Sequence, residues 1–515
     1  MPRFPAPTES PPSEAAGNPT TTAADQYCMT TTTERPSPPS RARTASDQSL
    51  PRLLKRLHFF AGVLCAPLIL IAAVTGFLYA VSPTVERILH HDLLTATVQD
   101  APTAPVSDQV TAARAEFPDL PLAGVRLGED DETTRVLLDD ADLPESTTRA
   151  VFVDPYSGEV VGDSTQYGSS GALPLRHWLS QGHRMLWLGE PGRIYSELAA
   201  SWLGVLAVGG LVMWWQRHRK HPERMLRTGG RGRTRTMRRH GATGTVVAVG
   251  LVFLTVTGLT WSSVAGANIG QMRSALSWQE PAVSTSIPGV AGASGTSGDA
   301  GAAEEHAGHE GHEGHEGHSG HGGAGASSGS GGFVRGLNPG SVDRVAATAV
   351  EELRAPVTLT PPASDGEAWT VKENRAAYRL TNDAISVDWA TGQVTDRVDF
   401  RDWPVAAQLS AWLIQLHMGT LFGLPNQLVL AALAAAIVVM VVWGYTMWFR
   451  RRGRNQVLAS VPPRASAPGS SWNAGTVTLA VALVAYAAVA PLFGVTCLAF
   501  VVLSALWSRF SRSRR

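Results

Sequence analysis

The sequence predicts an α-helical integral membrane protein that carries two small α+β modules outside the membrane. Three observations predict this class. Hydrophobic residues make up 44% of the 515-residue chain, and they gather in a few long blocks, as in proteins that cross a hydrocarbon core with about 20 apolar residues per helix. Segments between these blocks show helical and then strand periodicity. The order of blocks and segments in the first half of the chain is repeated in the second half.

Four apolar runs are long enough to be transmembrane spans. They occupy residues 57–81, 194–215, 242–264 and 424–449. A fifth run, 476–507, is too long for one span and is interrupted at Ala490-Pro491, so we expect a C-terminal helical hairpin, with a single long or re-entrant helix as the alternative. Residues 1–50 are rich in Pro, Ser and Thr and predict a disordered cytoplasmic tail.

Lys and Arg predict the orientation, because short cytoplasmic loops are rich in these residues. The segment from Gln216 to His240 contains ten Lys or Arg residues and one acid, Glu223, so we expect a basic cytoplasmic loop at 216–241. The loop 82–193 has eight basic and eighteen acidic residues and is expected outside. The C-terminus ends in arginines, which favours six spans over five and places both termini in the cytoplasm.

Each outer segment is expected to form a small module of one helix followed by short strands. The two modules are expected at 82–193 and 333–423. Helical spacing marks 106–117 and 341–354, and alternation marks 123–127, 135–138, 150–153 and several stretches of 357–387. Asp154 and Asp388 open matching turns, and each stands 29 residues before a histidine, His183 and His417. The duplication therefore extends through the modules, so that each unit is a span, a module and a span.

Four histidines repeat their spacing between the two halves. His58 and His240 each follow an Arg at two residues' distance and precede a Thr-Gly pair by 17 residues, and His183 and His417 each precede a glycine by 27 residues. Polar residues near the edges of apolar runs are costly and usually functional. Two parallel repeats are commonly related by an axis along the membrane normal. This symmetry pairs His58 with His240 at the cytoplasmic edge and His183 with His417 at the outer edge.

Two facing imidazoles can supply both axial ligands of a haem, so the two pairs predict two b-type haems, one near each face. Glycines at repeated offsets are expected to leave surfaces without side chains against these haems. They are Gly76, Gly258, Gly210 and Gly444. The alternative is that the histidines are interfacial residues and the glycines allow close helix packing. The chain has no Cys-x-x-Cys-His motif, which excludes covalently attached haem.

A Gly- and His-rich insert at 281–332 has no counterpart in the first half. Its six histidines follow one another at a strict period of three residues: His306, His309, His312, His315, His318 and His321. Imidazole ligands suit Cu, Ni and Zn, so we expect the insert to hold divalent metal loosely, because its glycine content argues against a preformed site. The alternative is a solvated spacer.

The chain resembles the PepSY-associated transmembrane family over about residues 52–452. The resemblance is carried by Arg-Leu-His at 56–58, the turn Asp-Pro-Tyr-Ser-Gly-Glu at 154–159, Gln-Gly-His-Arg-Met-Leu-Trp-Leu-Gly-Glu-Pro-Gly-Arg at 181–193, His240 with Thr-Gly-Leu-Thr-Trp-Ser at 257–262, and His417 with Gly-Thr-Leu-Phe-Gly at 419–423. It implies a bacterial inner-membrane protein with extracytoplasmic PepSY modules, similar to haem-containing reductases of siderophore-bound iron. It also implies that His58, His183, His240 and His417 are the haem ligands.

These observations predict a di-haem electron-transfer protein that reduces ferric-siderophore or cupric metal outside the membrane. No Rossmann or flavin motif is evident, so a separate electron donor is expected. Besides this donor and the metal substrate, we expect contact with membrane lipid and none with nucleic acid. Two alternatives are a non-enzymatic PepSY protein that restrains a secreted peptidase or envelope partner, and a metal-binding accessory to uptake. A peptidase is not expected, since no triad or His-Glu-x-x-His motif is present.

Overall fold

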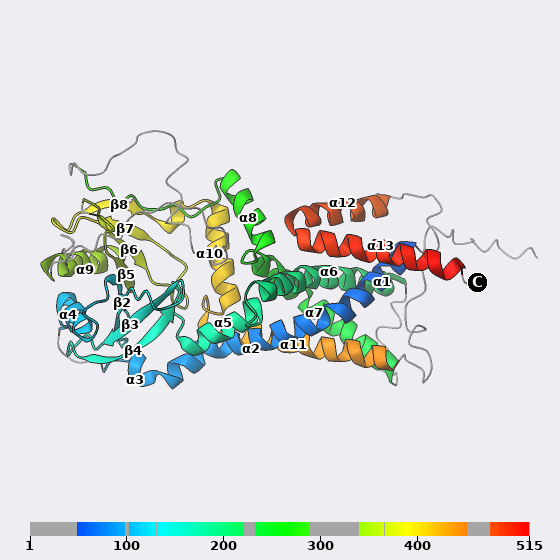
Figure 1. The fold of residues 1–515 in the computed structure, drawn as a ribbon, viewed down its shortest axis with the longest axis horizontal. Helices are drawn as coiled ribbons and strands as arrows, with labels where there is room; N and C mark the ends of the chain where they lie inside the picture. Colours follow the sequence, from blue (N-terminus) through cyan, green and yellow to red (C-terminus); the bar gives the residue numbers. More distant parts are fainter. Residues whose placement is uncertain are drawn as a thin grey trace, which may run out of the picture.

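The computed structural model describes residues 49–97, 102–129, 131–220, 232–288, 339–364, 366–450 and 474–513. The described chain forms a bundle of long helices with an antiparallel sheet at one end (Figure 1). Four of its helices are long and apolar enough to cross a membrane: Ala66–Leu89, Glu190–Arg219, Arg233–Leu259 and Gly423–Phe449. The protein is therefore a multi-pass membrane protein, as the apolar runs predict.

The helical layer has a simple order along the chain. Its long members are α1(Ser49–Leu64), α2(Ala66–Leu89), α6(Glu190–Lys220), α7(Arg233–Leu259) and α11(Gly423–Phe449), and shorter helices α5(Pro174–Met185), α8(Val264–Ala275) and α10(Val405–Met418) lie where the bundle approaches the sheet. Helix α6 packs against α7, and α11 packs against α2 and α7. Each pairing of α2 with α11 and of α6 with α7 joins one helix from before residue 221 to one from after residue 231, so the two halves of the chain are interleaved.

The first predicted span is two helices rather than one. Helix α1 ends at Leu64 and α2 begins at Ala66, with Cys65 between them and Pro67 in the first turn of α2. A proline lacks the N–H that a continuous helix needs and its ring crowds the preceding turn, which bends the helix. His58 therefore lies on α1, before the bend, and the stretch that is able to cross a membrane extends to Leu89, eight residues beyond the expected end.

The two predicted modules share one eight-stranded sheet. Its order is β4-β3-β2-β1-β5-β6-β7-β8, and every neighbouring pair is antiparallel. The strands are β1(Leu122–Arg126), β2(Thr134–Leu138), β3(Thr147–Val153), β4(Val160–Tyr167), β5(Val357–Thr360), β6(Trp369–Glu373), β7(Ala384–Val387) and β8(Val394–Val398). The seam between β1 and β5 pairs Val125 with Leu359 and Arg126 with Thr358. Sequence patterns predicted two modules but not this seam, which joins them.

The two faces of the sheet have different partners. On the face away from the bundle, α4(Val106–Glu116) and α9(Pro339–Leu353) cover a continuous apolar core that includes Val125, Val136 and Trp369. These three residues are fully buried. The other face looks toward the helical bundle. Strand residues alternate between the two faces, so Arg126 and Arg135, next to Val125 and Val136, lie on the bundle side.

Three short elements complete the connections, and two helices follow the last long one. The short elements are α3(His91–Leu94), η4(Phe400–Asp402) and the turn at Ala490, and the last helices are α12(Ala474–Val489) and α13(Pro491–Ser513). Helices α12 and α13 lie side by side along the bundle (Figure 1). The break falls at Ala490-Pro491, where the sequence predicts it. Trp202 on α6 donates to Thr496 Oγ1 at 3.1 Å, so this pair of helices is attached to the bundle.

Candidate functional site

Two of the four repeated histidines meet between the bundle and the sheet. His183 is on α5 and His417 is on α10, and their ring centres lie 6.4 Å apart. Both helices end in left-handed backbone just after the histidine, at Leu186 (φ 55°) after α5 and at Gly419 (φ 80°) after α10. The chain then turns into the long helices α6 and α11. His183 and His417 are thus on short helices of their own, separate from the helices that carry Gly210 and Gly444.

The other two histidines meet toward the far end of the bundle. His58 on α1 and His240 on α7 have ring centres 6.4 Å apart and ring planes at 85°. The structure therefore brings the four histidines together in the two pairs expected from the repeat symmetry. In both pairs one histidine comes from before residue 221 and the other from after residue 231.

The spacing of both pairs suits a metal between two imidazoles. A protein-bound transition metal holds an imidazole nitrogen at about 2.0 to 2.1 Å, and that nitrogen is about 1.1 Å from the ring centre, so two imidazoles on opposite sides of one metal have centres about 6.3 Å apart. The observed value is 6.4 Å for each pair. The residues present therefore fit the axial ligand set of a b-type haem.

In three of the four histidines, hydrogen bonds to Nδ1 determine which ring nitrogen is free to bind a metal. Nδ1 of His183 lies 2.9 Å from the carbonyl oxygen of Ala72, and Nδ1 of His240 lies 3.1 Å from that of Met440. A carbonyl only accepts, so Nδ1 carries the proton in both rings. Nδ1 of His417 lies 2.6 Å from Thr257 Oγ1, whose own hydrogen is donated to the carbonyl of Phe253. Nε2 of these three rings is left with a free lone pair, as in metal-binding histidines.

His58 differs in this respect. Its Nδ1 is buried without a hydrogen-bond partner among the described residues. Gly210, on the neighbouring α6, lies against this ring, because a Cβ there would be 3.3 Å from Cε1. The protonated nitrogen of His58 is therefore not determined by a hydrogen bond to Nδ1, unlike that of the other three rings.

The repeated glycines have two different surroundings. A Cβ at Gly76 would lie 2.9 Å from Cε1 of His183, so Gly76, like Gly210, makes room for an imidazole from another helix. A Cβ at Gly258 or Gly444 would meet no atom within 4 Å. Gly444 lies one helical turn beyond Met440, the residue that anchors His240. Gly258 and Gly444 thus have open space beside them, whereas Gly76 and Gly210 lie against the imidazole rings of His183 and His58.

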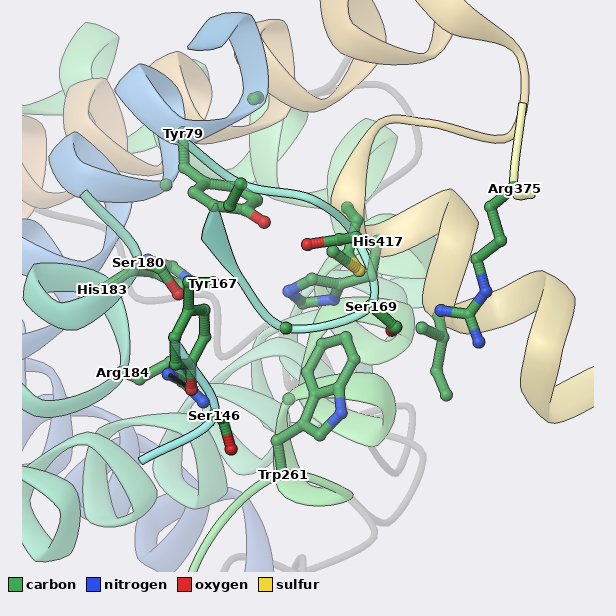
Figure 2. Close-up of a pocket in the computed structure, with 18 of the residues that line it drawn as sticks. Tyr79, Ser146, Tyr167, Ser169, Ser180, His183, Arg184, Trp261, Arg375 and His417 are labelled. Atoms are coloured by element: carbon green, nitrogen blue, oxygen red, sulfur yellow. Dashed lines mark hydrogen bonds between the residues drawn. The ribbon is translucent and has the colours of Figure 1, made fainter. Parts of the chain in front are cut away.

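A cavity of about 830 Å³ joins the His183–His417 pair to the bundle side of the sheet. Its lining includes both histidines and Trp261 (Figure 2). Gly76 and Gly258 also line it. Trp261 stands edge-on to His417 with ring centres 5.4 Å apart. This volume is within the usual range of small-molecule and cofactor pockets, about 300 to 1,000 Å³.

Burial keeps the two imidazoles at this cavity neutral. Burial, and then the neighbouring His183, lowers the pKa of His417 to about 3. Burial also lowers the pKa of His183, against the hydrogen bond that its Nδ1–H donates to the Ala72 carbonyl, which raises it. Since only a neutral imidazole binds a metal, both rings are in the form that a ligand requires.

Sequence reasoning missed the two threonines that precede the glycines of the first histidine motif. Thr257 Oγ1 holds Nδ1 of His417, and Thr75 Oγ1 lies 3.3 Å from Nδ1 of His183. The signal that identifies these threonines is the Thr-Gly pair, which repeats as a unit at 75–76 and 257–258. The six insert histidines lie outside the described residues. The first residues of the insert, 281–288, are described and lie along the sheet, where Ser284 N–H donates to Asp396 Oδ2 at 2.6 Å.

A family model described as the PepSY-associated TM region matches residues 55–451. The match covers more than half of the chain. The chain belongs to the PepSY-associated TM family. All four paired histidines of this PepSY-associated TM protein fall inside the matched region, and helices α12 and α13 lie after it. Comparison with curated proteins found no match.

Proposed function

We propose that this PepSY-associated TM protein is a membrane electron-transfer protein that binds two b-type haems and reduces a metal substrate at its cavity. One haem would be held by His58 and His240 and the other by His183 and His417. The observation that carries the proposal is the 6.4 Å spacing of both ring pairs together with free Nε2 lone pairs. Haem iron, when bound, changes between ferric and ferrous states and so carries one electron at a time.

The chain's own residues orient the ligand rings and exclude water. Ala72, Met440 and Thr257 fix the direction of three imidazoles through Nδ1, and such outer hydrogen bonds raise the basicity of the ligand nitrogen. Apolar helices surround both pairs, which protects a redox centre from bulk solvent. Trp261 covers one edge of His417 at the cavity.

We infer the direction of transfer from the position of the cavity. Only the His183–His417 pair lines it, so this pair would face the substrate, and His58 with His240 would face the electron donor. The basic segment after α6 favours the far end of the bundle as the cytoplasmic side. In this orientation the protein lies in a bacterial inner membrane with the sheet outside and both termini inside. The substrate would be a ferric chelate, such as a ferric siderophore, or cupric copper.

The direct test is the absorption spectrum of the full chain purified from haem-replete cells. We expect a Soret band that shifts when dithionite is added, and two haems per chain by the pyridine haemochrome assay. Reduced protein mixed with a ferric chelate should return to the oxidised spectrum. A purified, folded protein without a Soret band would contradict the proposal.

Loss of the Thr257 hydroxyl should weaken haem binding at the pair that lines the cavity. Thr257→Val removes the 2.6 Å contact to Nδ1 of His417, and loss of such an outer partner typically costs about 10- to 100-fold in affinity. Thr75→Val is the matched control, because His183 keeps its bond to the Ala72 carbonyl. Titration of haem into haem-depleted protein measures both. Equal effects of the two variants would refute the assigned role of Thr257.

A further inference from the structure

Two arginines lie directly opposite each other in the sheet above the cavity. Arg126 on β1 is paired in register with Arg135 on β2. Both are on the bundle side, since their neighbours Val125 and Val136 point into the core on the other side. Arg126 lines the cavity. Like charges that face each other across two strands are destabilising.

Neither guanidinium has a carboxylate partner in the described structure. Arg126 donates to the carbonyl of Ser169 at 3.4 Å, and Arg135 donates to Gln166 Oε1 at 3.2 Å and to the carbonyl of Gly171 at 3.4 Å. Arg135 also lies over the ring of Phe152, 5.4 Å from its centre. These contacts hold the side chains in place but supply no direct ion pair to either guanidinium.

Basic residues elsewhere in this layer are paired with acids. Arg149 contacts Asp140 and Asp163, and Lys372, whose side chain reaches the same cavity, contacts Glu280. Arg397 on β8 contacts Asp399 and Glu352. Arg126 and Arg135 therefore differ from these basic residues, because neither forms an ion pair with an acidic side chain in the described structure.

The two positive groups also crowd the same glycine. A Cβ at Gly171 would lie 3.0 Å from Nη1 of Arg135 and 3.1 Å from Nη1 of Arg126. Burial, and then the charge of Arg135, lowers the pKa of Arg126 to about 9, while Glu132 nearby raises it. The charged groups that act on this pair are Glu132, Glu86 and Arg176, and together with Arg126 and Arg135 these three arginines and two acids carry one net positive charge. This surplus matches one singly charged anion.

We propose that Arg126 and Arg135 form an anion site in the roof of the cavity that binds a carboxylate. Arginine offers a planar fork of N–H donors that matches the two oxygens of a carboxylate, and an anion between the two groups removes their mutual repulsion. The carboxylate has two possible sources. It belongs either to a propionate of a haem held by His183 and His417, which rests on the proposed function, or to a metal chelate that enters the cavity.

The first experimental arm uses ferric citrate as the probe. Isothermal titration calorimetry on the purified full chain compares the wild type with Arg126→Gln and Arg135→Gln. If the chelate is the source, each variant should bind ferric citrate about tenfold more weakly or worse, because a charge-assisted hydrogen bond is lost, and haem content should not change. Arg397→Gln, in β8 of the same sheet, is the control and should bind as the wild type does.

The second arm uses haem and haem dimethyl ester, whose propionates carry no charge. If a propionate is the source, haem binding to haem-depleted protein should weaken about tenfold in both variants, whereas binding of the ester should be the same in variants and wild type. Equal losses for haem and ester would contradict the site, as would unchanged affinity for both ferric citrate and haem. Failure of the proposed function has a different result, because the wild type itself would then bind neither porphyrin.

Thermal stability distinguishes a binding role from a structural one. Removing one of two facing like charges should leave the melting temperature of the ligand-free protein unchanged or higher. A structural role predicts a lower melting temperature in both variants, and that result together with unaltered affinities would overturn the proposal.

Discussion

His417→Ala is expected to reduce the haem content from two per chain to one. The substitution removes one member of the pair that lines the cavity and leaves His58 and His240, at the other pair, in place. Reduction of a ferric chelate should fall to background, because the remaining haem has no access to the cavity. His58→Ala should also remove one haem, but from the other pair. The pyridine haemochrome assay and the rate of reoxidation by a ferric chelate measure these effects.

The matched control for this experiment is His177→Ala. His177 is on α5 with His183, but its ring stacks on Tyr167 at 4.0 Å and contacts Gln181. We expect the control to keep two haems. If His417→Ala keeps both haems, or if a folded variant loses both, then the assignment of one haem to each pair is incorrect.

Glu86→Gln is expected to lower the free energy of unfolding by about 3 to 5 kcal/mol, because it leaves a buried arginine without its counter-ion. Glu86 is at the end of α2, with Oε2 3.2 Å from Nε of Arg176 on α5. The two side chains are 7% and 8% exposed. Oε1 also accepts the N–H of Leu173, just before α5. Unfolding by SDS in detergent micelles, followed by tryptophan fluorescence, measures the change.

Two controls separate charge from packing at this pair. Replacing both residues, as Glu86→Leu with Arg176→Met, removes the unpaired charge and should recover most of the loss. Glu352→Gln breaks the exposed pair with Arg397, whose side chains are 42% and 39% exposed, and should cost less than about 1 kcal/mol. A loss after Glu86→Gln no larger than that after Glu352→Gln would disprove the buried role of this ion pair.

Local patterns predicted much of the fold and which histidines lie close together. Four apolar runs correspond to four membrane-length helices. The turns at Asp154 and Asp388 form as expected and are closed in the same way, by N–H groups of Gly158 and Gly392 donating to the aspartate carbonyls. Short-range chemistry suffices for these features, because a turn needs only its own four to six residues and a span only its own apolarity.

Features that depend on distant residues were not predictable from one sequence. The seam between β1 and β5 joins residues more than 200 positions apart, and neither strand has a pattern that specifies its neighbour. The bend at Cys65 has a local cause, because Pro67 lies in the first turn of α2. The apolar run on both sides of Pro67 nevertheless predicts one continuous helix. The facing of Arg126 and Arg135 follows from strand register, which hydrophobic alternation in two short strands does not determine.

The β1–β5 seam predicts that the chain cannot be cut into two independently folded fragments. Without the seam, each set of four strands would expose β1 or β5 as an unpaired edge, and exposed edges promote aggregation. A fragment ending near residue 220 would also contain only one histidine of each pair. Neither half could then form a complete site alone, although two copies of one half could form both by association. The intact chain instead supplies the two halves in a fixed one-to-one ratio, so the seam and both histidine pairs form within one molecule.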